Sequence, residues 1–328
     1  MDQPVLAMEG LRTEVRLGGG WHPAVDGVSL ALAPRETLAL VGESGCGKSL
    51  TALSIMGLLP RPAVRVGAGR IVLDGIELTA LPEHALERLR GDRMAMVFQE
   101  PMTSLNPVMT IGDQVAESLR VHRGLSRAEA RARALAALEE VKIPSAARRL
   151  RDYPHQFSGG MRQRVMIAIA LACEPRLLLA DEPTTALDVT IQAQVLALLA
   201  DLKARHGTAM LFITHNLGVV AQVADRVAVM YAGQVAEEAA VGEVFARPAH
   251  PYTRALFAAI PRLDRDEQAL AAIPGRVPPL DAMPPGCRFA PRCPLVRAGC
   301  ERPQVLAPTG PPGHLARCHV ATGALAEA

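Results

Sequence analysis

The strongest chemical signal in the sequence is a glycine-rich octapeptide. It fits the G-x-x-x-x-G-K-[ST] pattern of a phosphate-binding loop at all fixed positions, and it consists of Gly42, Glu43, Ser44, Gly45, Cys46, Gly47, Lys48 and Ser49. Glycines let the backbone turn so that successive N–H groups point at phosphate oxygens. Lys48 would reach the β- and γ-phosphates, and the Ser49 hydroxyl would ligate Mg²⁺. The octapeptide predicts a site for a nucleotide polyphosphate; the alternative is a glycine-rich turn that binds nothing.

Two adjacent carboxylates form the second signal. Asp181 and Glu182 come directly after the apolar run 177–180, which is typical of a buried parallel strand. Ligands gather at the carboxyl ends of such strands in open α/β sheets. Asp181 suits a water-mediated contact to Mg²⁺, and Glu182 is placed to activate an attacking water. The alternative is that both residues only cap the next helix.

Further polar groups follow the same logic. Gln99 ends the strand predicted over 94–98 and could complete the Mg²⁺ shell, or it could be a capping amide. His215 ends the strand predicted over 209–214, where it could touch a γ-phosphate, although a lone histidine is more often structural. Ser158, Gly159 and Gly160 precede an apolar helix, so their bare N–H groups repeat the physics of the phosphate loop, or form an ordinary N-cap.

The elements that must position these residues can be predicted from hydrophobic spacing. A strand over 37–41 and a helix over 49–56 flank the phosphate loop. Alternating residues predict further strands, and spacing near 3.6 predicts further helices. The predicted elements are antiparallel strands within 5–33 broken at Gly18–Gly20, a hairpin over 70–78 around Asp74-Gly75, helical sequence over 111–141 and 189–205, and a last strand pair over 226–231 and 233–237 that closes the core. Trp21, in the first turn, could stack on a base or could simply pack.

Composition bounds the function. The chain has 328 residues, of which 49% are hydrophobic and 21% charged, with a net charge of +2. Near neutrality without long runs of one sign argues against an extended nucleic-acid footprint. The first residues lack the build of a signal peptide, and the apolar stretches fall short of the roughly 18 to 20 residues that span a bilayer. We therefore expect a cytoplasmic chain that reaches a membrane only through partners.

Four of the six cysteines lie near the C-terminus, where proline and glycine become frequent. Cys287, Cys293, Cys300 and Cys318 have the spacing C-x5-C-x6-C-x17-C, and a tail with so few periodic apolar residues would need such a staple. The C-x2-C knuckles of zinc ribbons are missing. Spacing alone leaves an iron–sulfur cluster, a zinc site and uncoordinated thiols open.

The ordered motifs together resemble the nucleotide-binding subunit of an ATP-binding-cassette (ABC) transporter. The likeness rests on the phosphate loop, Gln99, the signature 157–161, the Asp181-Glu182 strand end, the loop Ala186-Leu187-Asp188 and His215. Phe157 and Met161 depart from the family's Leu-Ser-Gly-Gly-Gln, and Asn216 stands where an aspartate is common. The resemblance implies a P-loop NTPase α/β core (1–245) with a flanking antiparallel β-subdomain and an inserted α-helical subdomain (about 100–170), followed by a small cysteine-stapled extension (246–328).

The tail is similar to the C-terminal extension of oligopeptide and dipeptide importer ATPases. The similarity covers the segments 250–256, 273–275 and 286–294, Cys300 and the Cys318-His319 end. In such importers this extension can carry a four-iron four-sulfur cluster on its cysteines, which favours that assignment over zinc. Nickel and glutathione importers share the extension, so the solute stays open.

The resemblance also implies a mechanism and partners. Each ATP, with Mg²⁺ bound by Ser49, Gln99 and Asp181, would lie between the phosphate loop of one chain and Ser158-Gly159-Gly160 of another, with Asp188 at the dimer interface. Glu182, His215 and Lys48 would be catalytic, and Trp21 would stack on adenine. The implied partners are two transmembrane permeases, a second and paralogous ATPase subunit and an extracytoplasmic solute-binding protein, with the chain peripheral on the cytoplasmic face of the inner membrane.

Two other hypotheses remain. One is a soluble non-transport ABC ATPase acting in DNA repair or translation, against which the single phosphate loop and the short inserted segment argue. The other is a redox or metal sensor, in which the cysteines act and the cassette is only a scaffold.

Overall fold

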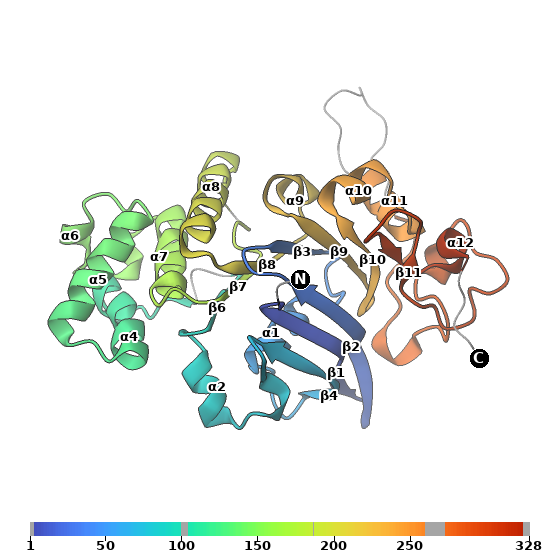
Figure 1. Ribbon diagram of the computed structural model, residues 1–328, viewed down its shortest axis with the longest axis horizontal. Coiled ribbons are helices and arrows are strands. Elements are labelled where there is room, and N and C mark those ends of the chain that lie inside the picture. Colours follow the sequence, from blue (N-terminus) through green and yellow to red (C-terminus); the bar gives the residue numbers. More distant parts are fainter. Residues whose placement is uncertain (1–2, 100–103, 186, 260–272, 324–328) are drawn as a thin grey trace. The chain divides into compact units, whose positions relative to one another are not determined.

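The computed structural model of the chain describes residues 3–99, 104–185, 187–259 and 273–323 (Figure 1). The chain forms two compact units, each built from separate stretches of sequence. The phosphate-loop unit consists of Ala7–Leu30, Thr37–Val72 and Ile213–Ala328. The helical unit consists of Met1–Leu6, Ala31–Glu36 and Leu73–Phe212. Residues 100–103 and Ala186, which the sequence assigns to the start of the inserted subdomain and to the loop before Asp188, lie outside the described residues.

A small sheet in the phosphate-loop unit is built on a hairpin. Its strands β1 (Leu6–Leu17), β2 (Gly20–Leu32) and β4 (Val64–Leu73) neighbour one another in the order β2-β1-β4. Gly18 and Gly19 connect β1 to β2 with φ of 54° and 85°, the left-handed pair that matches the twist of a tight hairpin. The expected strands and their glycine turn are therefore confirmed. Trp21 lies on β2, just beyond the turn.

The larger sheet of this unit carries the phosphate loop. Its order is β11-β12-β10-β9-β3, with β3 (Thr37–Val41) parallel to β9 (Arg226–Tyr231) and antiparallel pairing among β9, β10 (Gln234–Ala240), β12 (Leu315–Ala316) and β11 (Ala307–Pro308). The prediction that β9 and β10 are the last strand pair is wrong. Two short strands of the C-terminal extension continue the sheet, because Glu237 and Glu238 of β10 pair with β12.

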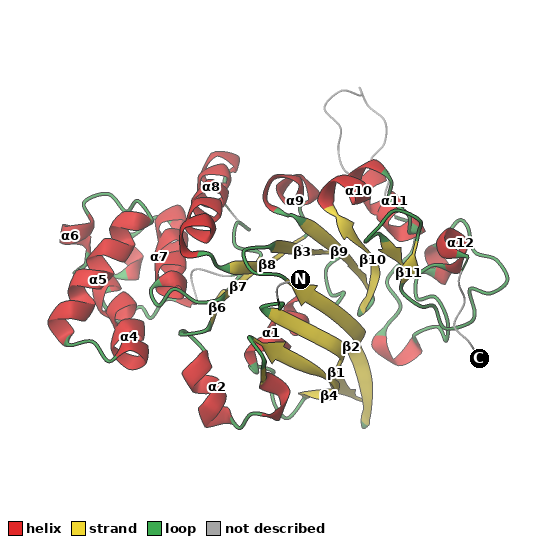
Figure 2. Ribbon diagram, in the orientation of Figure 1, coloured by secondary structure: helices red, strands yellow, loops and turns green. Residues whose placement is uncertain are grey.

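Helices of the phosphate-loop unit are short. They are α1 (Lys48–Met56), α9 (Leu217–Val223), α10 (Val241–Ala246), α11 (Pro251–Ala258) and α12 (His319–Thr322), with 3-10 turns at Leu280–Ala282 and Ala290–Arg292. Beyond α11 the described chain is mostly loop (Figure 2). The extension is nevertheless anchored, because Tyr252 and Phe289 are buried against Tyr231 of β9 in one apolar cluster.

The helical unit contains the strands that lead to the paired carboxylates. In the order β8-β7-β6, β6 (Met94–Val97) runs parallel to β7 (Leu177–Asp181), every residue of which is buried, and β8 (Ala209–Thr214) continues beyond the unit at its last two residues. A tight turn with φ of 46° at Asp74 and 82° at Gly75 leads into β5 (Ile76–Glu77), as expected for a hairpin. Helices α2 (Glu83–Leu89) and α8 (Val189–His206) and a 3-10 turn at Leu78–Ala80 also belong to this unit.

The remaining helices of the helical unit gather together in Figure 1. They are α4 (Ile111–Arg123), α5 (Arg127–Glu140), α6 (Ala146–Arg149) and α7 (Gly159–Leu171), with a 3-10 turn at Pro154–Gln156. The predicted helical stretch over 111–141 is two helices rather than one. Gly124 ends α4 with φ of 63°, and Ser126 starts α5 through a capping box with Glu129.

Candidate functional site

The phosphate loop joins β3 to α1, and its glycines adopt conformations that other residues avoid. φ is 152° at Gly42, 77° at Gly45 and 103° at Gly47. A Cβ on Gly42 would lie 2.1 Å from the carbonyl oxygen of Met230, and one on Gly47 would lie 2.8 Å from that of Ala24. The backbone thus makes the tight turn that the sequence predicts, and at Gly42 and Gly47 the neighbouring backbone leaves no room for a side chain.

Lys48 is held inside this loop. Its side chain is buried, and its Nζ donates to the carbonyl oxygens of Gly42 (2.8 Å) and Glu43 (3.0 Å). Burial raises the pKa of the Cys46 thiol, so the sulfur that lies 3.7 Å from the ammonium is neutral. In the part of the chain that the structure describes, the printed partners of Lys48 Nζ are these two carbonyl oxygens and the neutral thiol, so the positive charge of Lys48 would attract an anion that enters the loop.

The loop also presents free hydrogen-bond donors. In the part of the chain that the structure describes, the backbone N–H groups of Gly45, Gly47, Lys48 and Ser49 have no acceptor. Ser49 is exposed at the first turn of α1, where the helix dipole favours negative charge. A cradle of unused N–H groups, a lysine and a helix start fits phosphate oxygens, and the Ser49 hydroxyl is open to a cation that accompanies them.

The contacts of Glu43 could not be predicted from the sequence, because they are made by residues of the C-terminal extension. The Glu43 N–H donates to the hydroxyl oxygen of Tyr252 (2.9 Å), so this donor is not part of the cradle. Its carboxylate accepts from both terminal nitrogens of Arg292 (2.7 and 3.0 Å) and thereby raises the pKa of that guanidinium above its usual range. Neither partner stood out in the sequence, since no local spacing links residues more than two hundred positions apart.

The paired carboxylates occupy the end of β7 in the helical unit. Asp181 is the last residue of the strand and is buried, whereas Glu182 has left the strand with φ of 47°. The Glu182 carboxylate accepts from Gln99 Nε2 (3.1 Å) and from Thr185 Oγ1 (2.9 Å). The structure thus brings together Gln99, expected at the Mg²⁺, and Glu182, expected to activate the attacking water. Thr185 was not singled out, although its place three residues beyond Glu182 is a common distance for a local hydrogen bond.

Ser158, Gly159 and Gly160 form the start of α7, as predicted. The Ser158 hydroxyl caps the helix by accepting from the N–H of Met161 (3.4 Å), and both glycines lie in the first turn. A Cβ on Gly160 would meet Ile191 Cγ2 at 2.6 Å, so this glycine permits close packing of α7 on α8. The apolar helix that the sequence places after these residues therefore begins earlier, at the glycines themselves.

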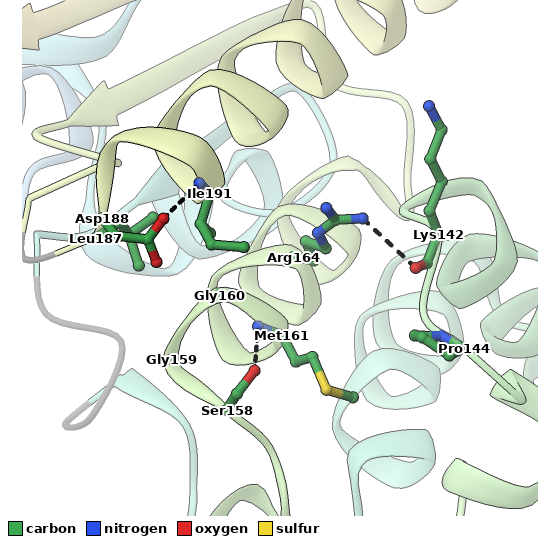
Figure 3. Close-up of a pocket in the computed structure, with 10 residues that line it drawn as sticks. All are labelled: Lys142, Pro144, Ser158, Gly159, Gly160, Met161, Arg164, Leu187, Asp188 and Ile191. Carbon is green, nitrogen blue, oxygen red and sulfur yellow. Dashed lines mark hydrogen bonds between the residues drawn. The ribbon is translucent and has the colours of Figure 1, made fainter.

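A pocket of about 550 Å³ opens over this helix start (Figure 3). It is lined by Lys142, Pro144, Ser158, Gly159, Gly160, Met161, Arg164, Leu187, Asp188 and Ile191. Asp188 caps α8 by accepting from the N–H of Ile191 (2.9 Å). The signature residues and Asp188 thus line one pocket, together with two basic side chains, which suits an anionic ligand.

His215 and Trp21 lie on two different sheet elements, His215 directly after β8 and Trp21 on β2. His215 is exposed directly after β8, and the neighbouring Asn216 caps α9 by accepting from the N–H groups of Gly218 and Val219. The Arg65 guanidinium lies over the Trp21 ring at 4.0 Å from its centroid. A cation already covers one face of the indole, so a base would have to use the other.

The four C-terminal cysteines form no disulfide, and Cys287 lies beside Cys300. The N–H of Cys287 donates to the carbonyl oxygen of Cys300 (2.8 Å), and burial, with the nearby thiols of Cys318, Cys300 and Cys293, raises the pKa of Cys287 to about 11. Thiols are the right kind of donor for iron or zinc. Among the described residues, however, no three His, Cys, Asp or Glu side chains are arranged closely enough to hold a metal ion.

These features define the class of protein: an α/β nucleotide-binding chain with a preformed phosphate loop. Comparison with known proteins narrows the class. Residues 25–185 match the model of the family described as ABC transporter, and residues 236–300 match that of the oligopeptide/dipeptide transporter C-terminal region. A Brucella abortus protein called a peptide import ATP-binding protein is 51% identical over 316 residues, 96% of this chain and 94% of its own length. A Brucella melitensis protein of the same description is 54% identical over 310 residues, 91% of this chain and 92% of its own.

Solved structures agree. A dimeric ATP-binding cassette in a post-hydrolysis state with ADP and Pi is 30% identical, with a TM-score of 0.65 over 72% of this chain and 98% of its own. CbiO1 of Clostridium perfringens, part of an ABC transporter complex, is 27% identical, with a TM-score of 0.64 over 75% of this chain and 92% of its own. The chain belongs to the ABC transporter family, and it is a transport ATPase of that family's peptide-import branch. No helix among the described residues is long and apolar enough to cross a membrane.

Proposed function

We propose that this chain hydrolyses ATP at the interface of two cassettes and thereby drives the import of peptides through partner membrane permeases. The observation that carries the proposal is the phosphate loop, which is already folded around Lys48 with unused N–H donors, in a chain whose tail matches the oligopeptide/dipeptide transporter C-terminal region. ATP supplies the anion that this cradle fits, and Mg²⁺ would supply charge neutralisation at the phosphates.

The residues would divide the work as follows. Lys48 and the loop N–H groups bind the β- and γ-phosphates, and Ser49, Gln99 and Asp181 would hold the Mg²⁺. Glu182 would accept a proton from the attacking water as the oxygen of that water bonds to the γ-phosphorus and ADP leaves. His215 would contact the γ-phosphate after β8. Trp21 would stack on adenine with the face that Arg65 leaves open.

The second half of each site would come from another cassette. Ser158, Gly159 and Gly160 offer a capped helix start, and Asp188 lines the same pocket. Two positive helix ends that share one γ-phosphate would be drawn together by ATP and released by hydrolysis. We propose a paralogous chain as the partner cassette, with an extracytoplasmic solute-binding protein delivering the solute and this chain peripheral on the cytoplasmic face of the inner membrane.

We propose the domain limits 1–245 for the cassette, with a helical subdomain over about 100–170, and 246–328 for the extension. The matches at 25–185 and 236–300 support two parts in this order. Burial of Tyr252 and Phe289 against β9 argues that the extension folds onto the cassette rather than as a separate body.

ATP hydrolysis in proteoliposomes tests the transport function. The chain, two permeases and the second ATPase would be reconstituted with the solute-binding protein and given peptide, nickel or glutathione. We expect peptide to accelerate hydrolysis and to accumulate inside the vesicles. If only nickel or only glutathione accelerates ATP hydrolysis, that compound and not peptide is the transported solute. Co-purification with ribosomes or DNA, and no response to any solute, would favour a non-transport ATPase.

We further propose that Cys287, Cys293, Cys300 and Cys318 hold a four-iron four-sulfur cluster. The backbone contact of Cys287 with Cys300 and the match of 236–300 to the oligopeptide/dipeptide transporter C-terminal region support a shared site, although the four thiols would have to come closer together on loading. Protein prepared without oxygen should absorb near 400 nm, about where such clusters absorb, and contain iron. Cys287→Ser should lose both signals, whereas Cys173→Ser, a buried thiol of the helical unit, should keep them. Colourless protein with stoichiometric zinc would overturn the iron assignment.

A further inference from the structure

Among the described residues of the C-terminal extension, Arg292 is bonded at every N–H of its guanidinium. Its Nε donates to Pro274 O (2.8 Å), one terminal nitrogen to Glu43 Oε2 (2.7 Å) and Tyr231 Oη (3.3 Å), and the other to Glu43 Oε1 (3.0 Å) and Ile273 O (3.1 Å). All five N–H donors of the guanidinium are therefore used, and the side chain is only 4% exposed. This geometry fixes the Glu43 carboxylate in one orientation.

The backbone of Glu43 is fixed as well. Tyr252, from α11, is fully buried and accepts the Glu43 N–H at its hydroxyl oxygen (2.9 Å). Burial raises the pKa of this phenol far above its usual range, so the hydroxyl stays neutral at any physiological pH. Glu43, the second residue of the phosphate loop, is thus hydrogen-bonded at its amide and at its carboxylate. Both partners, Tyr252 and Arg292, follow the cassette in the sequence.

Packing of aromatic rings determines where Tyr252 and Arg292 lie. Tyr231 and Tyr252 lie with ring centroids 4.6 Å apart, and Phe289 meets Tyr231 edge-on at 5.2 Å. Phe289 precedes the 3-10 turn that ends at Arg292, so the buried ring fixes the start of that turn. Because such aromatic clusters pack in specific geometries, Arg292 and Tyr252 cannot drift independently of the sheet.

The backbone of Glu43 also contacts Lys48 and the inner turn of the phosphate loop. Its carbonyl oxygen accepts from Lys48 Nζ (3.0 Å) and from the N–H of Cys46 (3.3 Å). Moving Glu43 would therefore move an acceptor that holds the lysine and one that closes the loop's inner turn. Elsewhere in the loop, the N–H of Gly233 donates to the carbonyl oxygen of Cys46 (2.9 Å), and Ser44 and Gly45 are exposed.

We propose that Arg292 and Tyr252 are positioning residues for ATP binding: they hold Glu43 so that the phosphate loop is folded before the nucleotide arrives. This inference rests on the proposed function, since it assigns a task toward the ATP that the loop would bind. Neither residue touches the reacting atoms. Their effect lies in the fraction of molecules whose loop is ready, and the apparent dissociation constant rises as that fraction falls.

The change Arg292→Gln tests this in the full-length chain. Losing a bidentate, charge-assisted pair should weaken ATP binding about ten- to a hundredfold, as measured by titration calorimetry. Tyr252→Phe keeps the buried ring and removes one acceptor, so we expect a loss of about three- to tenfold even if Arg292→Gln folds poorly. In the assembled transporter, the KM for ATP should rise while kcat stays within about twofold of the parent value. The lost contact stabilises bound ATP and the transition state equally, so its removal weakens binding without slowing the chemical step.

Arg288→Gln is the matched control. Arg288 also comes from the extension, is also buried and bonds both Asp26 and the carbonyl oxygen of Ala232, but it does not contact Glu43. We expect this variant to lose thermal stability as Arg292→Gln does, while ATP affinity stays within about twofold of the parent chain. Equal weakening of ATP binding by both variants would overturn the inference, because the extension would then act only by stabilising the fold in general.

The outcomes separate the inference from the proposed function. Lys48→Ala must abolish ATP binding; if the parent chain and Lys48→Ala bind ATP alike, or not at all, the proposed function fails. If Lys48→Ala abolishes binding while Arg292→Gln and Tyr252→Phe leave it unchanged, only the positioning role is wrong. As a last check, Glu43→Gln combined with Arg292→Gln should weaken binding no more than Arg292→Gln alone, since one pair is broken in both.

Discussion

Replacing Gly42 by alanine tests the geometry of the phosphate loop most severely. The added Cβ would lie 2.1 Å from Met230 O and 2.8 Å from Cys46 Sγ, at a φ of 152° that side chains rarely adopt. Because Met230 belongs to β9, its carbonyl cannot turn away, and the loop would have to move by about 1 Å. Overpacking costs about 1 to 3 kcal/mol and the backbone strain a similar amount, so Gly42→Ala should destabilise the chain by about 2 to 6 kcal/mol.

The same displacement should reach the ligand. A misplacement of about 1 Å in a positioned site can cost about a hundredfold in function. We therefore expect Gly42→Ala to bind ATP at least tenfold more weakly even at temperatures where it stays folded.

Urea unfolding followed by circular dichroism, with titration calorimetry for ATP, measures both effects. Gly27→Ala is the control, since Gly27 also has a left-handed φ, 66°, but a Cβ there meets nothing within 4 Å. It should cost only the backbone strain, about 1 to 2 kcal/mol, and leave ATP affinity unchanged. If Gly42→Ala is no less stable than Gly27→Ala, the close packing of the loop on β9 is not what the structure describes.

Three further predictions follow from single side chains. Asp188→Ala should cost about 1 kcal/mol through loss of the α8 cap, and should weaken ATP-driven dimerisation in sedimentation experiments, whereas Asp188→Asn should retain the cap. Burial lowers the pKa of His250 to about 4, so folding excludes a proton that the unfolded chain takes up near 6.5. The free energy of unfolding should then fall by about 3 kcal/mol in total as the pH drops from about 6.5 to 4, and His250→Asn, which can still cap α11, should flatten this slope in urea titrations. If Cys287 and Cys293 hold the proposed cluster, its oxidative loss should lower ATP affinity, because Arg292 lies between them in sequence. Unchanged affinity after iron loss would show that the cysteines do not influence the contact of Arg292 with Glu43.

Local sequence patterns were sufficient for the parts of the site that depend on a turn and its neighbours. The phosphate loop, the end of β7 at Asp181 and the helix start at Ser158 each occupy a few adjacent residues whose conformational preferences agree with the fold. Gly124 shows the limit of this approach. One glycine in a helical pattern is tolerated in some helices and ends others, and spacing alone could not choose.

Contacts between residues far apart in the chain could not be predicted from the sequence. Strands β11 and β12 have two residues each, too few to show alternation, and exist because β10 offers them an edge. The contact of Arg292 with Glu43 spans 249 positions and depends on where the aromatic cluster places the extension. Both are consequences of tertiary packing, and an arginine in a proline-rich tail carries no local sign of its partner.

The central claim is that this chain hydrolyses ATP with Glu182 activating the water. ATP turnover by Glu182→Gln in the assembled transporter tests it most directly, since glutamine preserves the shape and can still bond Gln99 and Thr185. We predict that ATP binding is retained, that the cassettes stay closed in a stable dimer, and that turnover falls by at least about a hundredfold. Turnover equal to that of the parent chain would contradict the account.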